Sequence, residues 1–165
     1  TEFLYSLPDV FDEQFPNRAN AFQFDTDTRN IFICADSKRL LSAFLELLSN
    51  AAEADNSCGS IQIHSHVNAC GHTVTVSVTG KGSLSEINPS EMQTNPLIDA
   101  DAPLTAQLST PFFSTKENHA GLGLSIVAQV CHTHHAGFEL YSQNGFTTAG
   151  ITFPILAMDD MRNTI

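Results

Sequence analysis

Apolar residues recur every three or four positions between Asp36 and Ala54, and this spacing predicts an amphipathic helix over residues 37–54. Asp36 is a typical N-cap residue for such a helix. The same spacing restarts near Gly121 and predicts a second helix that runs through Val130. The face of the first helix that we expect to be buried carries Leu40, Phe44, Leu47, Leu48 and Ala51.

Strict alternation of apolar and polar residues predicts a hairpin of two strands, Ser60–Val67 and His72–Thr79, with one buried face. A second pair of strands is predicted at 137–142 and 148–154, joined by a turn at Asn144-Gly145. Short apolar runs at 22–24 and 31–33 predict two further strands. This order of elements is typical of an α+β fold, with helices on one face of a mixed, mostly antiparallel sheet.

The segment 83–115 shows no sustained period and is rich in Pro, Ser, Thr and Asn. Loops of such length are usually functional. We therefore expect a single domain over residues 21–156 that contains one long loop, about 83–120. Residues 1–20 are interpreted as an N-terminal segment or linker, and residues 157–165 as a tail.

The charge balance narrows the possible partners. Seven Lys and Arg against eighteen Asp and Glu give a net charge of −11. Binding to a nucleic-acid backbone or to an anionic membrane surface needs clustered cations, so we expect neither partner. No apolar run approaches the ~18 residues of a membrane span. Four scattered cysteines without a CxxC pair favour a reducing, cytoplasmic location.

Polar residues form a second stripe on the first predicted helix, beside its apolar face. Glu46, Asn50 and Glu53 follow one another at three or four positions. Such a stripe is either an ordinary solvated helix face or a set of oxygen ligands for Mg²⁺ and a bound phosphate group. The helix alone leaves both interpretations open.

Two glycine motifs follow the predicted elements. Thr79-Gly80-Lys81-Gly82 comes directly after a strand, where glycines permit either a simple turn or the close approach of a ligand. Gly121-Leu122-Gly123-Leu124 opens the second helix, with Lys116 just upstream. Backbone N–H groups at a helix start bind anions, and Gly121 and Gly123 leave room for a phosphate.

The last cluster, Cys131-His132-Thr133-His134-His135, suggests either a metal site or simply the polar end of the second helix. Two histidines three positions apart without a second group of ligands do not meet the usual pattern of a zinc site. We therefore expect a helix end here.

Taken together, ELLSNAAEA (46–54), TGKG (79–82) and PFFSTKENHAGLGLSIV (111–127) resemble the N, G1, F and G2 boxes of sensor histidine kinases. More broadly, the chain is similar to the superfamily of gyrase, heat-shock chaperone and mismatch-repair ATPases. The resemblance implies a two-layer α/β sandwich of the Bergerat type that binds ATP and Mg²⁺, with residues 83–120 as the ATP lid.

The resemblance also implies roles for individual residues. Asn50 is expected to be the Mg²⁺ ligand and Glu46 the general base. Lys116 and the Gly121–Leu124 loop are expected at the phosphates. The expected residues at the adenine end are Ala54, Val78, Gly80, Gly82 and either Thr147 or Thr148.

One position departs from the family pattern. Val78 stands where the G1 box has an Asp that accepts a hydrogen bond from the adenine amino group. Losing a buried hydrogen bond to a charged group costs about 1.5–3 kcal/mol, so we expect weaker adenine binding. His119 and Ala120 also replace the usual small residues before Gly121. The alternative interpretation is a degenerate domain that regulates a partner.

The family's phosphorylated histidine lies on a separate helical dimerisation domain, and it is followed by Glu. None of the seven histidines here precedes a Glu. The resemblance therefore implies the catalytic domain of a phosphotransferase in a phosphorelay, which does not phosphorylate itself in isolation. Its implied partners are the histidine-bearing domain and a response regulator.

Overall fold

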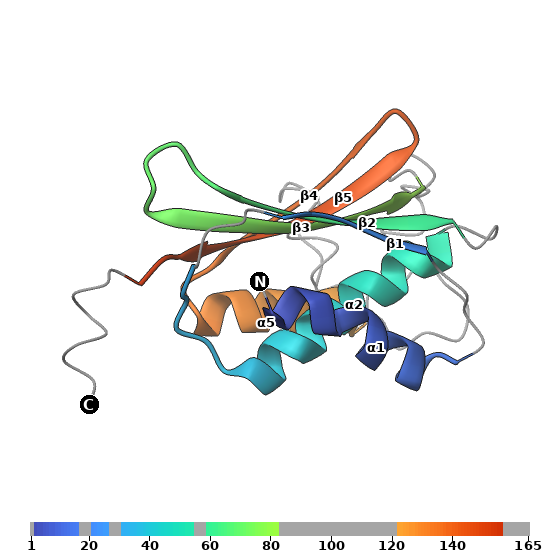
Figure 1. The fold of residues 1–165 in the computed structure, drawn as a ribbon, viewed down its shortest axis with the longest axis horizontal. Coiled ribbons are helices and arrows are strands. Elements are labelled where there is room, and N and C mark those ends of the chain that lie inside the picture. Colours follow the sequence, from blue (N-terminus) through green and yellow to red (C-terminus); the bar gives the residue numbers. More distant parts are fainter. Residues whose placement is uncertain (1, 17–20, 27–30, 55–58, 83–121, 157–165) are drawn as a thin grey trace, which may run out of the picture.

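The computed structural model describes residues 2–16, 21–26, 31–54, 59–82 and 122–156, which form two layers. One layer is a twisted sheet, and the other consists of helices that all lie against the same face of it (Figure 1). The elements, in chain order, are α1 (Glu2–Gln14), β1 (Ala21–Thr26), α2 (Ser37–Ala54), β2 (Ser60–Val67), β3 (Thr73–Lys81), α5 (Gly123–Thr133), β4 (Gly137–Gln143) and β5 (Phe146–Pro154).

The five strands are ordered β1-β2-β3-β5-β4 across the sheet. Among the described strands, β1 and β2 pair in parallel, and the three other pairings are antiparallel. The predicted α+β class, with a mixed and mostly antiparallel sheet and helices on one face, is confirmed.

The two faces of the sheet differ in chemistry because side chains alternate along each strand. Val74, Val76 and Val78 of β3 are buried, as are Ile151 and Phe153 of β5. These residues pack beneath the helices. On the opposite face, threonine hydroxyls pair across the same two strands, with Thr75–Thr152 and Thr79–Thr148 oxygens each 2.9 Å apart.

Helix α1 lies in the segment that the sequence interpretation treats as a linker. Its buried residues are spaced as on one helix face, and Phe11 is fully buried against the ring of Phe22, with centroids 5.8 Å apart. Phe3 meets Phe44 of α2 edge-on at 5.8 Å. Pro8 lies inside the helix and obscures its pattern in the sequence, because proline normally interrupts helices.

The strand expected at residues 31–33 is wrong. Residues 31–36 have irregular backbone, although Ile31 and Ile33 are partly buried against the core. Phe32 accepts one backbone hydrogen bond from Leu156 at 2.9 Å, which does not amount to a ladder. The expected lid and the expected tail at 157–165 lie outside the described residues.

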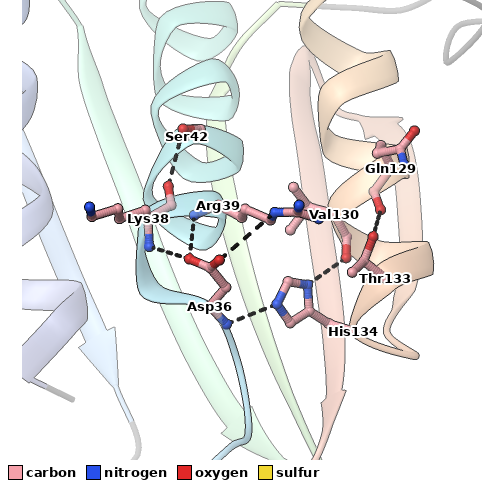
Figure 2. A network of polar contacts seen from close by, with 8 residues as sticks. All are labelled: Asp36, Lys38, Arg39, Ser42, Gln129, Val130, Thr133 and His134. Atoms are coloured by element: carbon pink, nitrogen blue, oxygen red, sulfur yellow. Dashed lines mark hydrogen bonds and ion pairs between the residues drawn. The ribbon is translucent and has the colours of Figure 1, made fainter.

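Helices α2 and α5 are joined where α2 begins and α5 ends (Figure 2). The Asp36 carboxylate accepts hydrogen bonds from the N–H groups of Lys38 and Arg39, at 2.9 and 3.2 Å. The N–H of Asp36 in turn donates to Nε2 of His134 at 2.9 Å, and Nδ1 of His134 lies 2.7 Å from the carbonyl of Val130. Since a carbonyl only accepts, Nδ1 of His134 donates this hydrogen bond.

The backbone at the end of α5 turns sharply just after His134. Ala136 donates to the carbonyl of Cys131 at 2.8 Å, and His135 adopts a left-handed conformation with φ of 51°. These are the features of a Schellman cap. This cap shows that residues 131–135 form the end of α5. Within the described ranges no group of three His, Cys, Asp or Glu residues is placed to hold a metal ion.

Candidate functional site

Glu46 and Asn50 lie on α2 beneath the first turn of α5. A Cβ placed on Gly123 would lie 2.6 Å from Oε2 of Glu46 and 3.7 Å from Nδ2 of Asn50. Both side chains are partly buried. The glycine at the start of α5 therefore permits a carboxylate and an amide of α2 to approach the N-terminus of the neighbouring helix.

The electrostatics of this end of α5 favour negative charge. The helix is 11 residues long, and its N-cap residue Leu122 makes no side-chain hydrogen bond to the first turn. A helix N-terminus carries about half a positive charge, and its first N–H groups lack partners within the helix. Both the Glu46 carboxylate and a phosphate group would be stabilised at this position.

The first glycine motif packs against the C-terminal half of α2. A Cβ on Gly80 would lie 2.8 Å from Cβ of Ala51, and one on Gly82 would lie 2.9 Å from Cβ of Ala54. Gly82 also has φ of +144°, a conformation that side chains rarely adopt. Only glycines let the end of β3 approach the helix this closely.

The β4–β5 hairpin holds Gly82 in place. The N–H of Gly82 donates to the carbonyl of Gly145 at 2.9 Å. The hydroxyl of Thr147 donates to the carbonyl of Gly82 at 3.0 Å, and Oγ of Ser142 lies 2.6 Å from Oγ1 of Thr147. Sequence reasoning missed Ser142 and Gly145. The signal that could have found Ser142 is the register of the Asn144-Gly145 turn, which places position 142 opposite position 147.

The two candidate threonines lie on opposite faces of the sheet. Thr147 pairs with Gly80, whose face is turned toward α2. Thr148 pairs with Thr79 on the other face and shares a hydrogen bond of 2.9 Å with it. Of the two, Thr147 is the residue that the fold brings to the side of the helices.

Val78 is only 2% exposed and lies on the same face of the sheet as Gly80. Its partners in register are Ile63 on β2 and Ala149 on β5, and both are buried. The surface of the sheet around position 78 is therefore apolar.

The remaining residues of the predicted site are placed only in part. Leu122 is 38% exposed at the start of α5, and Leu124 packs against the core. Lys116 and Gly121 lie outside the described residues. In the described part of the chain, helix and sheet bring together Glu46, Asn50, Ala54, Val78, Gly80, Gly82, Gly123 and Thr147 along α2.

This set of groups fits a nucleotide with Mg²⁺. Asn50 and Glu46 offer oxygen atoms, which are the ligands that Mg²⁺ prefers, and the start of α5 offers N–H groups for phosphate. As a separate point, crossing a membrane requires a length and apolar character that none of the described helices has.

Comparisons with known proteins point to one family. The model of the "Histidine kinase-, DNA gyrase B-, and HSP90-like ATPase" family matches residues 35–157. The sensory histidine kinase/phosphatase NtrB of Rhizobium leguminosarum bv. phaseoli is 34% identical over 127 residues, which cover 74% of this chain and 32% of that protein. The sensor histidine kinase ZraS of Escherichia coli K12 is 29% identical over 123 residues, or 74% of this chain and 22% of ZraS.

Solved structures give the same result. The catalytic domain of histidine kinase ThkA superimposes with a TM-score of 0.69 at 26% identity, covering 93% of this chain and 90% of that domain. The chain spans only between 20% and 33% of the curated relatives NtrB, ZraS and DctB that it matches. From the family match and the shared architecture, the chain belongs to the histidine kinase-, DNA gyrase B- and HSP90-like ATPase family, as a catalytic ATP-binding domain of the sensor histidine kinase type.

Proposed function

We propose that this domain binds ATP with Mg²⁺ and donates the γ-phosphate to a histidine on a separate helical dimerisation domain. The observation that carries the proposal is the close approach of Gly123 at the start of α5 to the Glu46–Asn50 pair of α2, where an added Cβ would have no room. It unites an anion-binding helix end with oxygen ligands for a metal. Neither the helix end nor the pair of oxygen ligands would by itself support a nucleotide site.

The residues at the phosphate end act by positioning and by neutralising charge, which is the main demand of phosphoryl transfer. Asn50 would hold Mg²⁺ through its amide oxygen, and the ion would supply positive charge that neutralises the phosphates. The N–H groups of Gly123 and Leu124 bind the phosphates, with Gly121, Leu122 and Lys116 contributing by resemblance to the family. Glu46 accepts the proton of the attacking group at its carboxylate.

At the other end of α2 we propose the site of the base. Ala54, Gly80, Gly82 and Thr147 surround it, and Val78 presents an apolar wall where the family has an acceptor. The missing hydrogen bond predicts affinity for adenine that is lower by about tenfold to a hundredfold than with an Asp at this position.

The partners follow from the family. The ThkA structure in complex with the response regulator TrrA shows that a histidine kinase with this fold engages such a partner. We propose a response regulator and a histidine-bearing dimerisation domain as partners of this chain, in a cytoplasmic phosphorelay. The exposed free thiols of Cys34 and Cys70 are consistent with a reducing compartment.

Calorimetric titration with ATP and Mg²⁺ tests the proposal. Binding should be measurable, and Asn50→Ala should weaken it by at least about tenfold, the loss typical even of residues that only support a metal ligand. Gln129→Ala removes an exposed amide from α5 and serves as the matched control. Absence of heat at millimolar nucleotide would exclude the function. Phosphate transfer is then measured with a dimerisation domain supplied separately, where Glu46→Gln should slow transfer and leave ATP affinity nearly unchanged.

Val78 is the one observation that favours the second candidate, a regulatory module without nucleotide. In that case Val78→Asp should create ATP binding that the parent lacks. Because position 78 is buried among apolar side chains, the variant should also be less stable without nucleotide. Equal ATP affinity of the parent and the variant would argue against this second function.

A further inference from the structure

Two histidines and an aspartate lie together on the face of the sheet opposite the described helices. The buried Ile61 and Ile63 of β2 face the helices. Since side chains alternate along a strand, His64 and His66 point to the other face. Asp25 of the edge strand β1 pairs in register with His64. The side chain of His64 is 43% exposed and that of Asp25 is 88% exposed, so dissolved ions can reach both.

The two imidazole rings are spaced as binding to one metal ion requires. Their centroids lie 5.3 Å apart, with an angle of 34° between the ring planes. With metal–nitrogen bonds of about 2.0–2.1 Å, two imidazoles on one tetrahedral ion have centroids about 5 Å apart. His66 is exposed, and in the described part of the chain no group forms a hydrogen bond with its ring nitrogens. Both rings are therefore available to a shared ion.

Asp25 determines which nitrogen of His64 is free to bind. Nδ1 of His64 lies 3.1 Å from Oδ2 of Asp25. An ionised carboxylate only accepts hydrogen bonds, so Nδ1 donates, and in the neutral imidazole the lone pair is then on Nε2. Histidines that bind metals commonly donate their other ring N–H to a carboxylate, which orients the ring and makes the free nitrogen a better ligand.

We propose that His64 and His66 together bind a divalent late transition-metal ion such as Zn²⁺, with Asp25 as a positioning residue. Imidazole nitrogen suits Zn²⁺, whereas Mg²⁺ prefers oxygen ligands. The protein supplies two ligands and water completes the coordination, in keeping with the finding that no group of three metal-binding side chains surrounds one site in the described ranges. This site lies across the sheet from α2 and Asn50, and it does not depend on nucleotide.

Calorimetric titration with Zn²⁺ tests the proposal, in the absence of nucleotide and with the exposed thiols of Cys34 and Cys70 alkylated. One Zn²⁺ should bind per chain, and an excess of Mg²⁺ should not displace it. His64→Gln and His66→Gln should each weaken binding by at least about tenfold, and Asp25→Ala by about tenfold, the loss typical of a group that orients a metal ligand. Glutamine already stands at position 62 on this face, so these variants should keep the fold.

Two variants serve as controls and should leave Zn²⁺ affinity unchanged. Glu139→Ala removes a carboxylate from the same row of paired residues as His64, but at the opposite edge strand, β4. His132→Ala removes an exposed imidazole from the end of α5.

NMR signals of the imidazole nitrogens give a second readout that a purely structural effect would not change. On addition of Zn²⁺, Nε2 of His64 should bind the ion while Nδ1 keeps its proton, and Asp25→Ala should remove this preference. No binding at millimolar Zn²⁺, or full affinity in both glutamine variants, overturns the metal site. Unchanged affinity and an unchanged Nε2 preference in Asp25→Ala overturn the role of Asp25.

Discussion

Gly80 sets how closely β3 approaches α2, and replacing it with alanine tests this contact directly. The added Cβ would lie 2.8 Å from Cβ of Ala51 and 3.0 Å from both its Cα and its carbonyl oxygen. Carbon atoms pack best at about 3.5–4.0 Å, so each contact is too short by roughly half an ångström to one ångström. Two of the three atoms belong to the backbone of α2, which has no flexible end to move aside.

The expected loss in the free energy of unfolding follows from the cost of overpacking a core, which is about 1–3 kcal/mol. Gly80→Ala should lower the free energy of unfolding by this amount, because α2 must shift away from the sheet. The matched control is Gly137→Ala in β4, where the new Cβ would meet its nearest neighbour, Cβ of Thr152, at an ordinary 3.8 Å. That variant should be neutral or slightly stabilising, since alanine restricts the unfolded chain.

Urea unfolding of both variants measures the difference, and a double-mutant cycle with Ala51→Gly isolates the contact. Ala51→Gly alone should cost about 1 kcal/mol as a glycine in a helix. In the double variant the Cβ–Cβ overlap is gone, so the combined loss should be smaller than the sum of the two single losses. Gly80→Ala should also weaken ATP binding. If Gly80→Ala is as stable as Gly137→Ala, the close approach of β3 to α2 does not constrain position 80. If the two losses simply add, the clash lies with the backbone of α2 and not with Cβ of Ala51.

Two further predictions concern the ends of α2 and α5. The N–H of Arg39 is the main cause that holds the pKa of the Asp36 carboxyl below its ordinary value of 3.8, and the N–H of Lys38 contributes; burial opposes them. A depressed pKa adds stability above pH ~4 that is lost as the pH falls through the folded-state pKa. Asp36→Asn should therefore melt below the parent at pH 7, with a gap that narrows at pH 3; an equal gap at both pH values would contradict this. His135→Gly should raise the free energy of unfolding by about 0.5–1 kcal/mol, because glycine adopts the left-handed conformation without strain; a lower urea midpoint would refute it.

Local patterns in the sequence predicted most of the elements correctly. The apolar spacing of 37–54 and the alternation of 60–67 each follow from a single face that is buried in the structure. The turn at Asn144-Gly145 has positive φ at both residues, 54° and 78°, as a tight hairpin turn of the Asn-Gly type requires. These features depend only on residues close together in the chain.

Other elements could not be predicted in this way. α1 contains Pro8, and its burial depends on Phe22 and Phe44, which come from other parts of the chain. Residues 31–33 have the apolar composition of a strand, but their backbone is irregular. The neighbour of the edge strand β1 is β2, so residues 31–33 do not pair with β1 as a hairpin would require. His134 at the end of α5 accepts a hydrogen bond from the N–H of Asp36 at the start of α2. The two residues lie 98 positions apart in the chain, so no local pattern in the sequence indicates this contact.

By itself, the sequence determined the motifs of the site, because Asn50 on a helix and the glycines after a strand and before a helix are local features. It left open whether Thr147 or Thr148 belongs to the site. That choice depends on the register of β3 against β5, because a shift of one residue turns every side chain to the opposite face. Only the packed sheet, with Gly80 opposite Thr147 and against α2, places Thr147 and Ser142 beside the glycine loop.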